Sequence, residues 1–375
     1  MLKYSVKKII SIVLTACFFL TAMPLQAIAE IIEEEREWQA ILNAFDEGER
    51  NIYEEPLDEQ YLEEYDYRDA FEFGHIDEIY ETNRFIIKYK EDSETWQELE
   101  SESLKTPDGN RSASGRREVS LERGVSFDRI AESVDAVSAE AIESGNILVL
   151  NITEEMTAAE LIETAFSDAD MKEILYIQPD YEMAFSAVLD GSFIDKPWAE
   201  NTVGQEAAIS LPKNNIIVAL LDTGVDTHHP DLSGKLMDGY DFVNNSTNVN
   251  NEEWYYDQGH GTGLAGVISK DGATVMPLKI FEGGKAYTSH ILEAISYAEE
   301  NGARIANMSF GSRFYNPALE EAIKGSNMLF VCAAGNLLAN IDKYPVYPAS
   351  FDLPNVLSVA SVDDEGKLVY LSSEK

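Results

Sequence analysis

The chain has 375 residues, of which 45% are hydrophobic, and it carries a formal net charge of −40 at pH 7. This length suffices for two or three domains, and the apolar content excludes wholesale disorder. The charge argues against nucleic acid or an anionic membrane surface as a partner, because a phosphate-binding surface needs clustered Lys and Arg.

Residues 1–29 have the pattern of an export signal. Three lysines precede an apolar stretch from Ile9 to Met23, and Ala27-Ile28-Ala29 provides a cleavage site. The stretch is too short to favour a transmembrane helix, so we expect no membrane partner once the signal is removed. Cys17 lies in a sequence that resembles a bacterial lipobox, but the residues after it stay apolar. We therefore expect a secreted protein rather than a lipid anchor at Cys17. Removal of the signal would leave Cys332 as the last cysteine, which excludes an intrachain disulfide.

Residues 30–80 form an acidic segment, with nineteen Asp and Glu against three Arg, and the simplest interpretation is a solvated surface helix and linker. The pattern changes at Arg84, and residues 81–185 predict a small α+β domain. We expect strands at 84–90, 147–150 and 174–181, helices at 94–104 and 157–166, and a flexible basic loop at 107–117.

After a connector at residues 186–210, the pattern becomes that of an α/β domain. Ile216 to Leu221 is a run of six apolar residues, which fits a strand buried on both faces, and it ends in Asp222-Thr223-Gly224. Strands and helices then alternate, which predicts a parallel, doubly wound sheet. The expected helices are 289–300, capped by Ser289, and 317–324, and the expected strands are 305–310, 328–331 and 356–362.

Three short motifs occur in order in this α/β region. Asp222-Thr223-Gly224 follows the buried strand, His260-Gly261-Thr262-Gly263 follows a polar loop, and Ala333-Ala334-Gly335-Asn336 follows the strand at 328–331. An acid at the carboxyl end of a buried strand lies where α/β folds build their sites. The three motifs in this order resemble the subtilisin-like serine protease family, over a region from about Trp198 to Val362.

The resemblance implies an α/β fold, a doubly wound parallel sheet of subtilisin type, and a role for each motif. His260 would act as the general base, and Asp222 would hold its ring in one tautomer. Asn336 would donate a hydrogen bond to the oxyanion. Two extended segments, Ser309-Phe310-Gly311 and Ala333-Ala334-Gly335, would flank the backbone of an extended polypeptide substrate, which is recognition by strand addition.

The amino-terminal half resembles the same family. Residues 81–185 are similar to the ferredoxin-like propeptide of secreted subtilisin-like zymogens, which acts as an intramolecular chaperone and inhibitor. The resemblance implies a signal peptide at 1–29, the acidic segment at 30–80, a propeptide domain at 81–185 and a peptidase domain at 186–375. The chain's own propeptide is then a partner of the peptidase domain, with cleavage expected between about Met183 and Trp198. A separate small binding domain at 81–185 is the alternative interpretation.

The sequence departs from the family at the nucleophile. The Gly-Thr-Ser-Met-Ala segment that carries the serine in the family does not occur after Asn336, so the peptidase domain is incomplete and no acyl-enzyme can form. We expect a protease gene cut short by a frameshift, a stop codon or a contig end, and a chain that is inactive alone. Asp231 matches a calcium ligand of the family but has lost its partners, so we predict neither a metal nor another cofactor.

Two other functions compete with this interpretation. A nucleotide-binding protein is one, because residues 261–266 read G-x-G-x-x-G, but the stretch before them is polar rather than a buried strand. A non-catalytic protein is the other, in which the propeptide-like domain inhibits or chaperones a protease in trans. The sequence is compatible with this second alternative.

Overall fold

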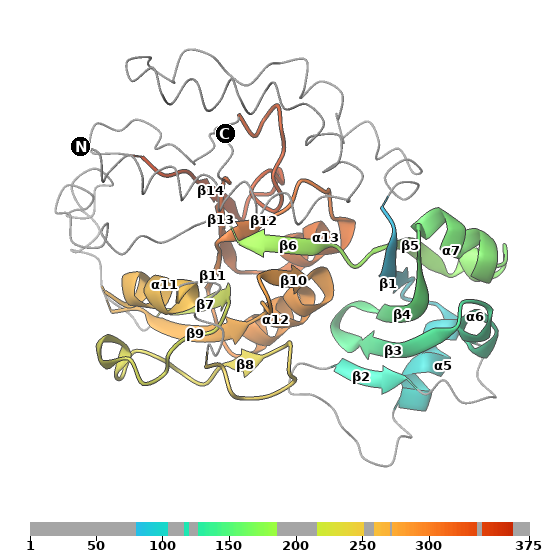
Figure 1. Cartoon of the computed structure of the whole chain (residues 1–375), viewed down its shortest axis with the longest axis horizontal. Helices are drawn as coiled ribbons and strands as arrows, with labels where there is room; N and C mark the ends of the chain where they lie inside the picture. The colour runs from blue at the N-terminus through green and yellow to red at the C-terminus, as the bar shows by residue number, and fades with distance from the viewer. Residues whose placement is uncertain are drawn as a thin grey trace.

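The computed structural model describes residues 80–103, 116–119, 127–185, 216–250, 259–270, 272–335 and 340–362. The expected export signal with Cys17, the acidic segment up to residue 79, the connector and Asn336 lie outside these ranges. In Figure 1 the described residues form two units, which we call the antiparallel unit (residues 80–181) and the parallel unit (residues 216–362). No helix in the described ranges is both long enough and apolar enough to cross a membrane.

The antiparallel unit is a sheet of five strands in the order β2-β3-β4-β1-β5, with every neighbouring pair antiparallel. Its strands are β1 (Thr82–Tyr89), β2 (Arg116–Val119), β3 (Ala136–Ile142), β4 (Ile147–Met156) and β5 (Ile174–Pro179), and its helices are α5 (Glu94–Ser103), α6 (Asp128–Ser133) and α7 (Ala158–Ala165). Alternate residues of β1, Phe85 and Ile87, join Leu99 of α5 and Leu161 of α7 in one buried cluster. This unit therefore has a hydrophobic core of its own.

Two strands of the antiparallel unit were not predicted from the sequence. β3 consists largely of Ala and Ser, which are weak strand formers, and it is a strand because it pairs with both β2 and β4. The loop predicted at 107–117 is wrong at its end, because Arg116 and Arg117 pair with Ile142 and Ala141 in β2. The other predicted strands and helices of this unit are present.

The parallel unit is built on six parallel strands in the order β14-β13-β11-β7-β9-β8. Its strands are β7 (Ile217–Asp222), β8 (Tyr240–Asp241), β9 (Thr274–Lys279), β11 (Ile305–Met308), β13 (Leu329–Ala333) and β14 (Val356–Val359), and its helices are α11 (His260–Ser269), α12 (Thr288–Glu300) and α13 (Pro317–Gly325). Consecutive residues of β7 face opposite sides of the sheet. Leu221 lies in a cluster with Ile291 of α12, whereas Leu220 lies in a cluster with Ala265 of α11. Helices therefore cover both faces, which confirms the predicted doubly wound sheet.

The cap predicted for α12 is wrong. The helix begins at Thr288, so Ser289 is its second residue, and Tyr287 before it makes no side-chain cap bond. Asp180 of the antiparallel unit caps the helix instead, because it accepts hydrogen bonds from Ser289 N at 2.8 Å and from Ser289 Oγ at 2.7 Å. The local sequence could not show this, since the capping residue lies 109 positions earlier.

One strand links the two units. β6 (Glu182–Phe185) lies between β10 (Lys285–Tyr287) and β12 (Phe310–Gly311) and is antiparallel to both. In Figure 1 this strand reaches from the antiparallel unit across the parallel unit. The strand predicted at 305–310 is therefore two strands, because β11 ends at Met308 and β12 belongs to the sheet of β6.

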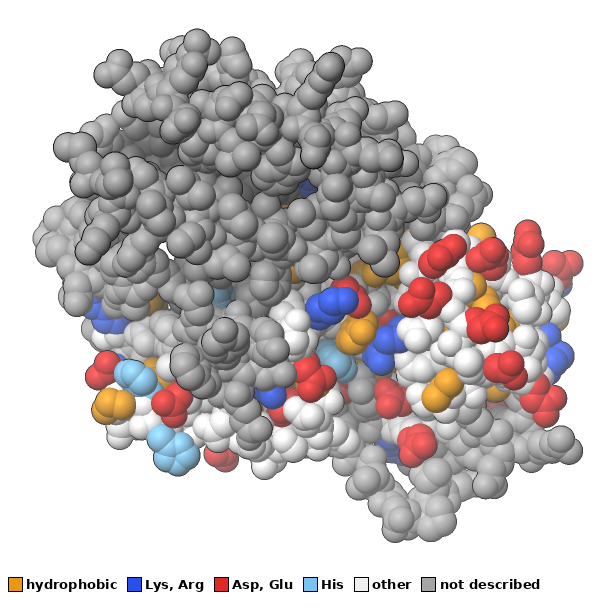
Figure 2. All heavy atoms as spheres, viewed as in Figure 1, with side chains coloured by type: hydrophobic (Ala, Val, Ile, Leu, Met, Phe, Trp, Pro, Cys, Tyr) orange, Lys and Arg blue, Asp and Glu red, His pale blue; other side chains and the backbone are white. Residues whose placement is uncertain are grey.

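Apolar packing adds to this link. Ile86 of β1 and Val149 of β4 share a buried cluster with Leu292 of α12 and Ala318 of α13. The antiparallel sheet thus packs one face on its own helices and the other on two helices of the parallel unit. Figure 2 shows acidic side chains spread over the face of the antiparallel unit that is in view.

A carboxylate anchors the first turn of α5. Glu173 Oε2 accepts hydrogen bonds from Thr95 N at 2.9 Å and from Ser93 Oγ at 2.8 Å, and Ser93 Oγ accepts one from Trp96 N. The hydrogen bond from the Thr95 backbone, followed by that from Ser93, lowers the pKa of Glu173 below its ordinary value. The ionised form therefore stabilises the folded unit.

We expect Glu173→Gln to destabilise the antiparallel unit by about 0.5–2 kcal/mol at neutral pH. Because the folded pKa is lowered, this contribution is fully present above the ordinary value of 4.5 and is lost as the pH falls through the folded value. The measurement is urea unfolding of the full chain, followed by Trp96 fluorescence after the other tryptophans are replaced by Phe. Glu163→Gln, on the exposed face of α7, is the matched control, and an equal effect of both variants at neutral pH would contradict the prediction.

Candidate active site

The first predicted site residue, Asp222, is the last residue of β7 and lies at the carboxyl edge of the parallel sheet. Its side chain is buried, and Oδ1 accepts hydrogen bonds from Thr223 N at 2.8 Å and from Thr223 Oγ1 at 3.2 Å. The other oxygen, Oδ2, is buried and accepts no hydrogen bond from the described residues. Burial of an unpaired carboxylate costs free energy, so a buried Asp222 needs a hydrogen-bonding partner.

The partner is His260. Its Nδ1 lies 2.8 Å from Asp222 Oδ1, and both side chains are 1% exposed. His260 is the first residue of α11, and Gly259 before it has a φ of 74°, a backbone conformation that favours glycine. Because Asp222 contacts Nδ1, any proton exchange between this ring and a reacting group has to use Nε2. The predicted juxtaposition of Asp222 and His260 is present, while their catalytic roles stay a prediction.

A second glycine permits the contact. Gly261 N donates to Thr223 Oγ1 at 3.3 Å, and a Cβ on Gly261 would lie 2.1 Å from Gly224 O and 3.0 Å from Asp222 Oδ1. A residue without a side chain is therefore needed where α11 meets the end of β7. The same glycine opens the G-x-G-x-x-G stretch, which is helical here rather than the tight turn that holds a pyrophosphate. This geometry argues against the nucleotide-binding alternative.

The other predicted site residues that the structure describes follow strands β11 and β13, which end at the same edge of the parallel sheet as β7. Ser309 follows β11 and accepts a hydrogen bond from Asn307 Nδ2, while Phe310 and Gly311 form β12 beside β6. Ala333 ends β13, and the two residues after it in the predicted segment are Ala334 and Gly335. The first of these, Ala334, donates its N–H to Val359 O, on the side of β14. Asn336 lies outside the described residues, and its role stays a prediction.

The second neighbour of β6 is β10, which the sequence analysis did not single out. The register pairs Ala286 with Met183 on this side, and Gly311 with Ala184 on the β12 side. A usable signal existed, because Gly283-Gly284 stands between Glu282 and Lys285, which exchange backbone hydrogen bonds across a tight turn. Consecutive glycines of this kind are typical of a short hairpin.

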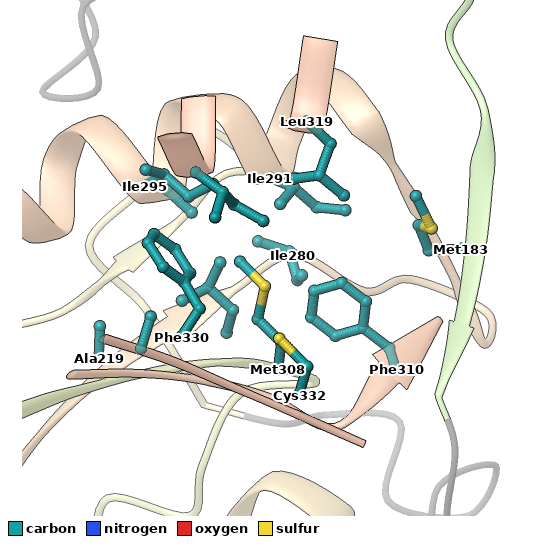
Figure 3. Packing of buried hydrophobic residues seen from close by; sticks show 14 of the residues in the cluster. Met183, Ala219, Ile280, Ile291, Ile295, Met308, Phe310, Leu319, Phe330 and Cys332 are labelled. Carbon is teal, nitrogen blue, oxygen red and sulfur yellow. The ribbon is translucent and has the colours of Figure 1, made fainter. Parts of the chain in front are cut away.

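A side chain of β6 enters the core of the parallel unit. Met183 is 1% exposed and belongs to the same buried cluster as Phe281, Ile291 and Phe310. Figure 3 shows it reaching from β6 toward this cluster, beside Phe310. Burial of a methionine side chain contributes about 1.5–3 kcal/mol. β6 is therefore held by side-chain burial as well as by its backbone pairing.

Polar contacts hold the segment just before β6. Asp180 is 1% exposed, and its Oδ2 accepts a hydrogen bond from Arg84 Nε at 3.2 Å. The same carboxylate accepts the hydrogen bonds from Ser289 N and Ser289 Oγ at the start of α12. Burial alone would lower the pKa of Arg84, but the charge and hydrogen bonds of Asp180 raise it overall. The guanidinium also lies 4.2 Å from the ring centre of Tyr287. Asp180 thus links both units at one buried point.

A second polar link lies at the start of α13. Gln178 is 3% exposed, and its Oε1 accepts a hydrogen bond from Ala318 N at 3.0 Å. Its Nε2 donates to the Oδ1 atom of Asn316, the N-cap residue of the helix, also at 3.0 Å. Residues of the antiparallel unit therefore satisfy backbone groups at the starts of two helices of the parallel unit.

Two serines that follow the Ala333–Gly335 segment are engaged elsewhere. Ser350 Oγ accepts from Val346 N and donates to Ile341 O, and Ser358 Oγ donates to Ala349 O. Both hydroxyls are thus bound to backbone groups, and the absence of the family's nucleophile stays a prediction. Among the residues that the structure describes, no group of three or more His, Cys, Asp or Glu is placed to hold a metal ion.

Comparison with protein families gives one description for this region. Residues 213–375 match the model of the Subtilase family, the Peptidase_S8 family. Thermitase of Thermoactinomyces vulgaris is 32% identical over 166 residues, which are 39% of this chain and 54% of that protein. Fervidolysin of Fervidobacterium pennivorans is 34% identical over 173 residues, which are 40% of this chain and 24% of that protein. The chain thus spans about half of the first relative and a quarter of the second.

Solved structures agree on the fold. The crystal structure of fervidolysin, described as a keratinolytic enzyme related to subtilisin, has 22% sequence identity and a TM-score of 0.51, over 76% of this chain and 43% of that one. The S393A mutant of the epidermin leader peptide processing serine protease from Staphylococcus aureus has 18% identity and a TM-score of 0.51, over 78% of this chain and 73% of that one. At these identities the likeness concerns the fold alone.

We expect Gly261→Ala to destabilise the parallel unit by about 1–3 kcal/mol, because the new Cβ meets the backbone oxygen of Gly224. Gly266→Ala, in the same helix, is the matched control. A Cβ there meets nothing within 4 Å, and alanine should stabilise α11 by about 0.5–1 kcal/mol. Urea unfolding and the histidine NMR signals of both variants measure the effect. Equal stability of the two variants would contradict the close approach of α11 to β7.

Proposed function

Because residues 213–375 match the model of the subtilase family, we propose that the parallel unit carries the Asp-His part of a serine endopeptidase site. In this proposal Asp222 orients His260, which acts as the general base. The observation that supports it most is the 2.8 Å contact between the two buried side chains at the carboxyl edge of a parallel sheet. A turn-forming Asp and a surface His would need neither this burial nor this contact.

The proposed chemistry is peptide-bond hydrolysis. A serine hydroxyl attacks the carbonyl carbon while His260 Nε2 takes its proton, and Asp222 stabilises the imidazolium that forms. By the family resemblance, Asn336 donates to the oxyanion. His260 then returns the proton to the leaving amine, and water, activated in the same way, releases the acyl group. The 375 residues contain no Gly-Thr-Ser-Met-Ala segment, so none of their serines has the sequence context of the attacking hydroxyl.

We also propose that residues 81–185 are the propeptide of this peptidase and that residues 1–29 direct its export. The position of β6 supports the first part, because this strand lies beside Ser309–Gly311, where an extended polypeptide substrate would add to the sheet. A chain segment in that position excludes a substrate. The lysines at the start of residues 1–29 and the short apolar stretch after them support a secreted precursor.

An inhibitor that acts in trans is the second candidate. It is favoured by one observation, the separate hydrophobic core of the antiparallel unit, which fits a module able to bind a groove in another molecule. Failure of a polypeptide of residues 81–185 to inhibit a related subtilisin would rule this candidate out.

We expect a fluorophosphonate probe to leave the purified 375-residue polypeptide unlabelled, because no serine in it has the sequence context of the family's nucleophile. A complete subtilisin, labelled under the same conditions, is the positive control. Covalent labelling of any serine in this polypeptide, located by peptide mass spectrometry, would show that these 375 residues do contain a reactive serine nucleophile.

We expect Asp180→Ala to loosen the contact between the units by about 2–4 kcal/mol, because the substitution leaves Arg84 and Ser289 N without their buried acceptor. Hydrogen exchange of residues 182–185, followed by mass spectrometry, measures the loosening. Glu321→Gln is the control. It breaks the Lys88–Glu321 ion pair of the same interface, but Glu321 is 48% exposed, so a cost below about 1 kcal/mol is expected. Similar exchange in both variants would contradict the central role of Asp180.

A further inference from the structure

The segment that enters the groove between β10 and β12 alternates in character. Tyr181 and Met183 are both buried. Tyr181 stacks on Phe314, and Met183 joins the buried cluster of the parallel unit. Glu182, the first residue of β6, is partly exposed and carries a charge. Glu182 Oε2 lies 2.8 Å from Lys285 Nζ on the neighbouring strand β10. At the position of Glu182, the groove therefore places the ammonium group of Lys285 beside the carboxylate of the bound segment.

The position of Lys285 is fixed by the backbone. The register pairs Tyr287 with Glu182 and Lys285 with Ala184, so Lys285 and Glu182 are diagonal neighbours across an antiparallel pair. Long side chains reach each other at this spacing. Lys285 also exchanges backbone hydrogen bonds with Glu282 across the preceding turn, which holds its strand in place.

We propose that Lys285 is a specificity-determining residue, which makes this groove selective for extended peptides with Asp or Glu at the position of Glu182 and a mid-sized apolar residue at the position of Met183. The inference rests on the proposed function, in which β6 occupies the substrate groove. Lys285 belongs to the parallel unit and stays beside the groove when the antiparallel unit leaves. Arg84 also contacts β10, at Tyr287, but it belongs to the antiparallel unit and leaves with it.

The expected size of the preference for Glu over Lys at this position follows from the solvent exposure of the Lys285–Glu182 ion pair. The Lys285 side chain is 49% exposed and that of Glu182 is 25% exposed, so solvent screens the pair. Partly exposed ion pairs of this kind shift an equilibrium by about 2- to 5-fold. The apolar contact of Met183 fixes the register, and Lys285 then separates peptides that differ only in the preceding residue.

The experiment measures peptide binding, which needs no nucleophile. Fluorescent peptides with the sequence of residues 180–185, and with Lys or Gln in place of Glu182, are titrated by anisotropy into the full chain carrying Asp180→Ala, whose β6 is held less tightly. We expect the Glu peptide to bind about 2- to 5-fold more tightly than the Lys peptide. Adding Lys285→Glu should reverse this order, and Lys285→Arg should keep it. Lys324→Glu, on exposed α13 surface, makes the same change in net charge and should leave the order unaltered.

Equal binding of the Glu and Lys peptides would overturn the role of Lys285 and leave the groove as a peptide site. Failure of every peptide to bind, in a folded chain whose residues 182–185 exchange freely and have therefore left the groove, would overturn the groove itself and with it the proposed substrate site. A charge-swap cycle in the otherwise unaltered chain is an independent test. Glu182→Lys and Lys285→Glu should each raise hydrogen exchange in residues 182–185, and the double variant should restore protection. Absence of that recovery would also overturn the inference.

Discussion

The geometry of the site depends on how closely the start of α11 approaches the end of β7. The backbone at Gly261 lies so near Gly224 O that no side chain fits between them. This approach places His260, the first residue of the helix, against Asp222, the last residue of the strand. The contact between Asp222 and His260 is thus a consequence of how the backbones of α11 and β7 pack. A site preorganised in this way loses little entropy when it engages a reacting group.

The second constraint is the way the two units share helix starts. The N–H groups in the first turn of a helix have no partner within the helix. In α12 and α13 the antiparallel unit provides acceptors, from Asp180 and Gln178, which lie two residues apart at the end of β5 and just after it. Part of the stability of the parallel unit therefore resides in the other unit. A parallel unit that depends on such caps would fold better with the antiparallel unit attached, and under the proposed function this is how residues 81–185 would assist folding.

The sequence predicted those features that are local and strongly patterned. The six apolar residues before Asp222 identified β7, and the motif order led to the contact with His260. Features that depend on distant partners were missed or misread. β3 is rich in Ala and is a strand because it pairs with two neighbours. The acceptor at Ser289 N comes from Asp180 rather than from the adjacent sequence. β10 was not predicted because a strand of three residues shows little periodicity, although the two glycines before it indicate a turn.

These constraints bear on how β6 can be both held and released under the proposed function. While the chain is continuous, the tether keeps β6 near its groove at a high effective concentration, so even modest contacts keep the groove occupied. Cleavage beyond Phe185 would leave the interface to hold the units together by itself. That interface combines a few buried points, Met183 and Asp180 among them, with partly exposed ion pairs such as Lys88–Glu321 and Glu182–Lys285. The buried points supply most of the affinity, because exposed pairs contribute little. An agent that removes one buried point, for example a second cleavage near Asp180, would therefore release the groove more effectively than a rise in ionic strength.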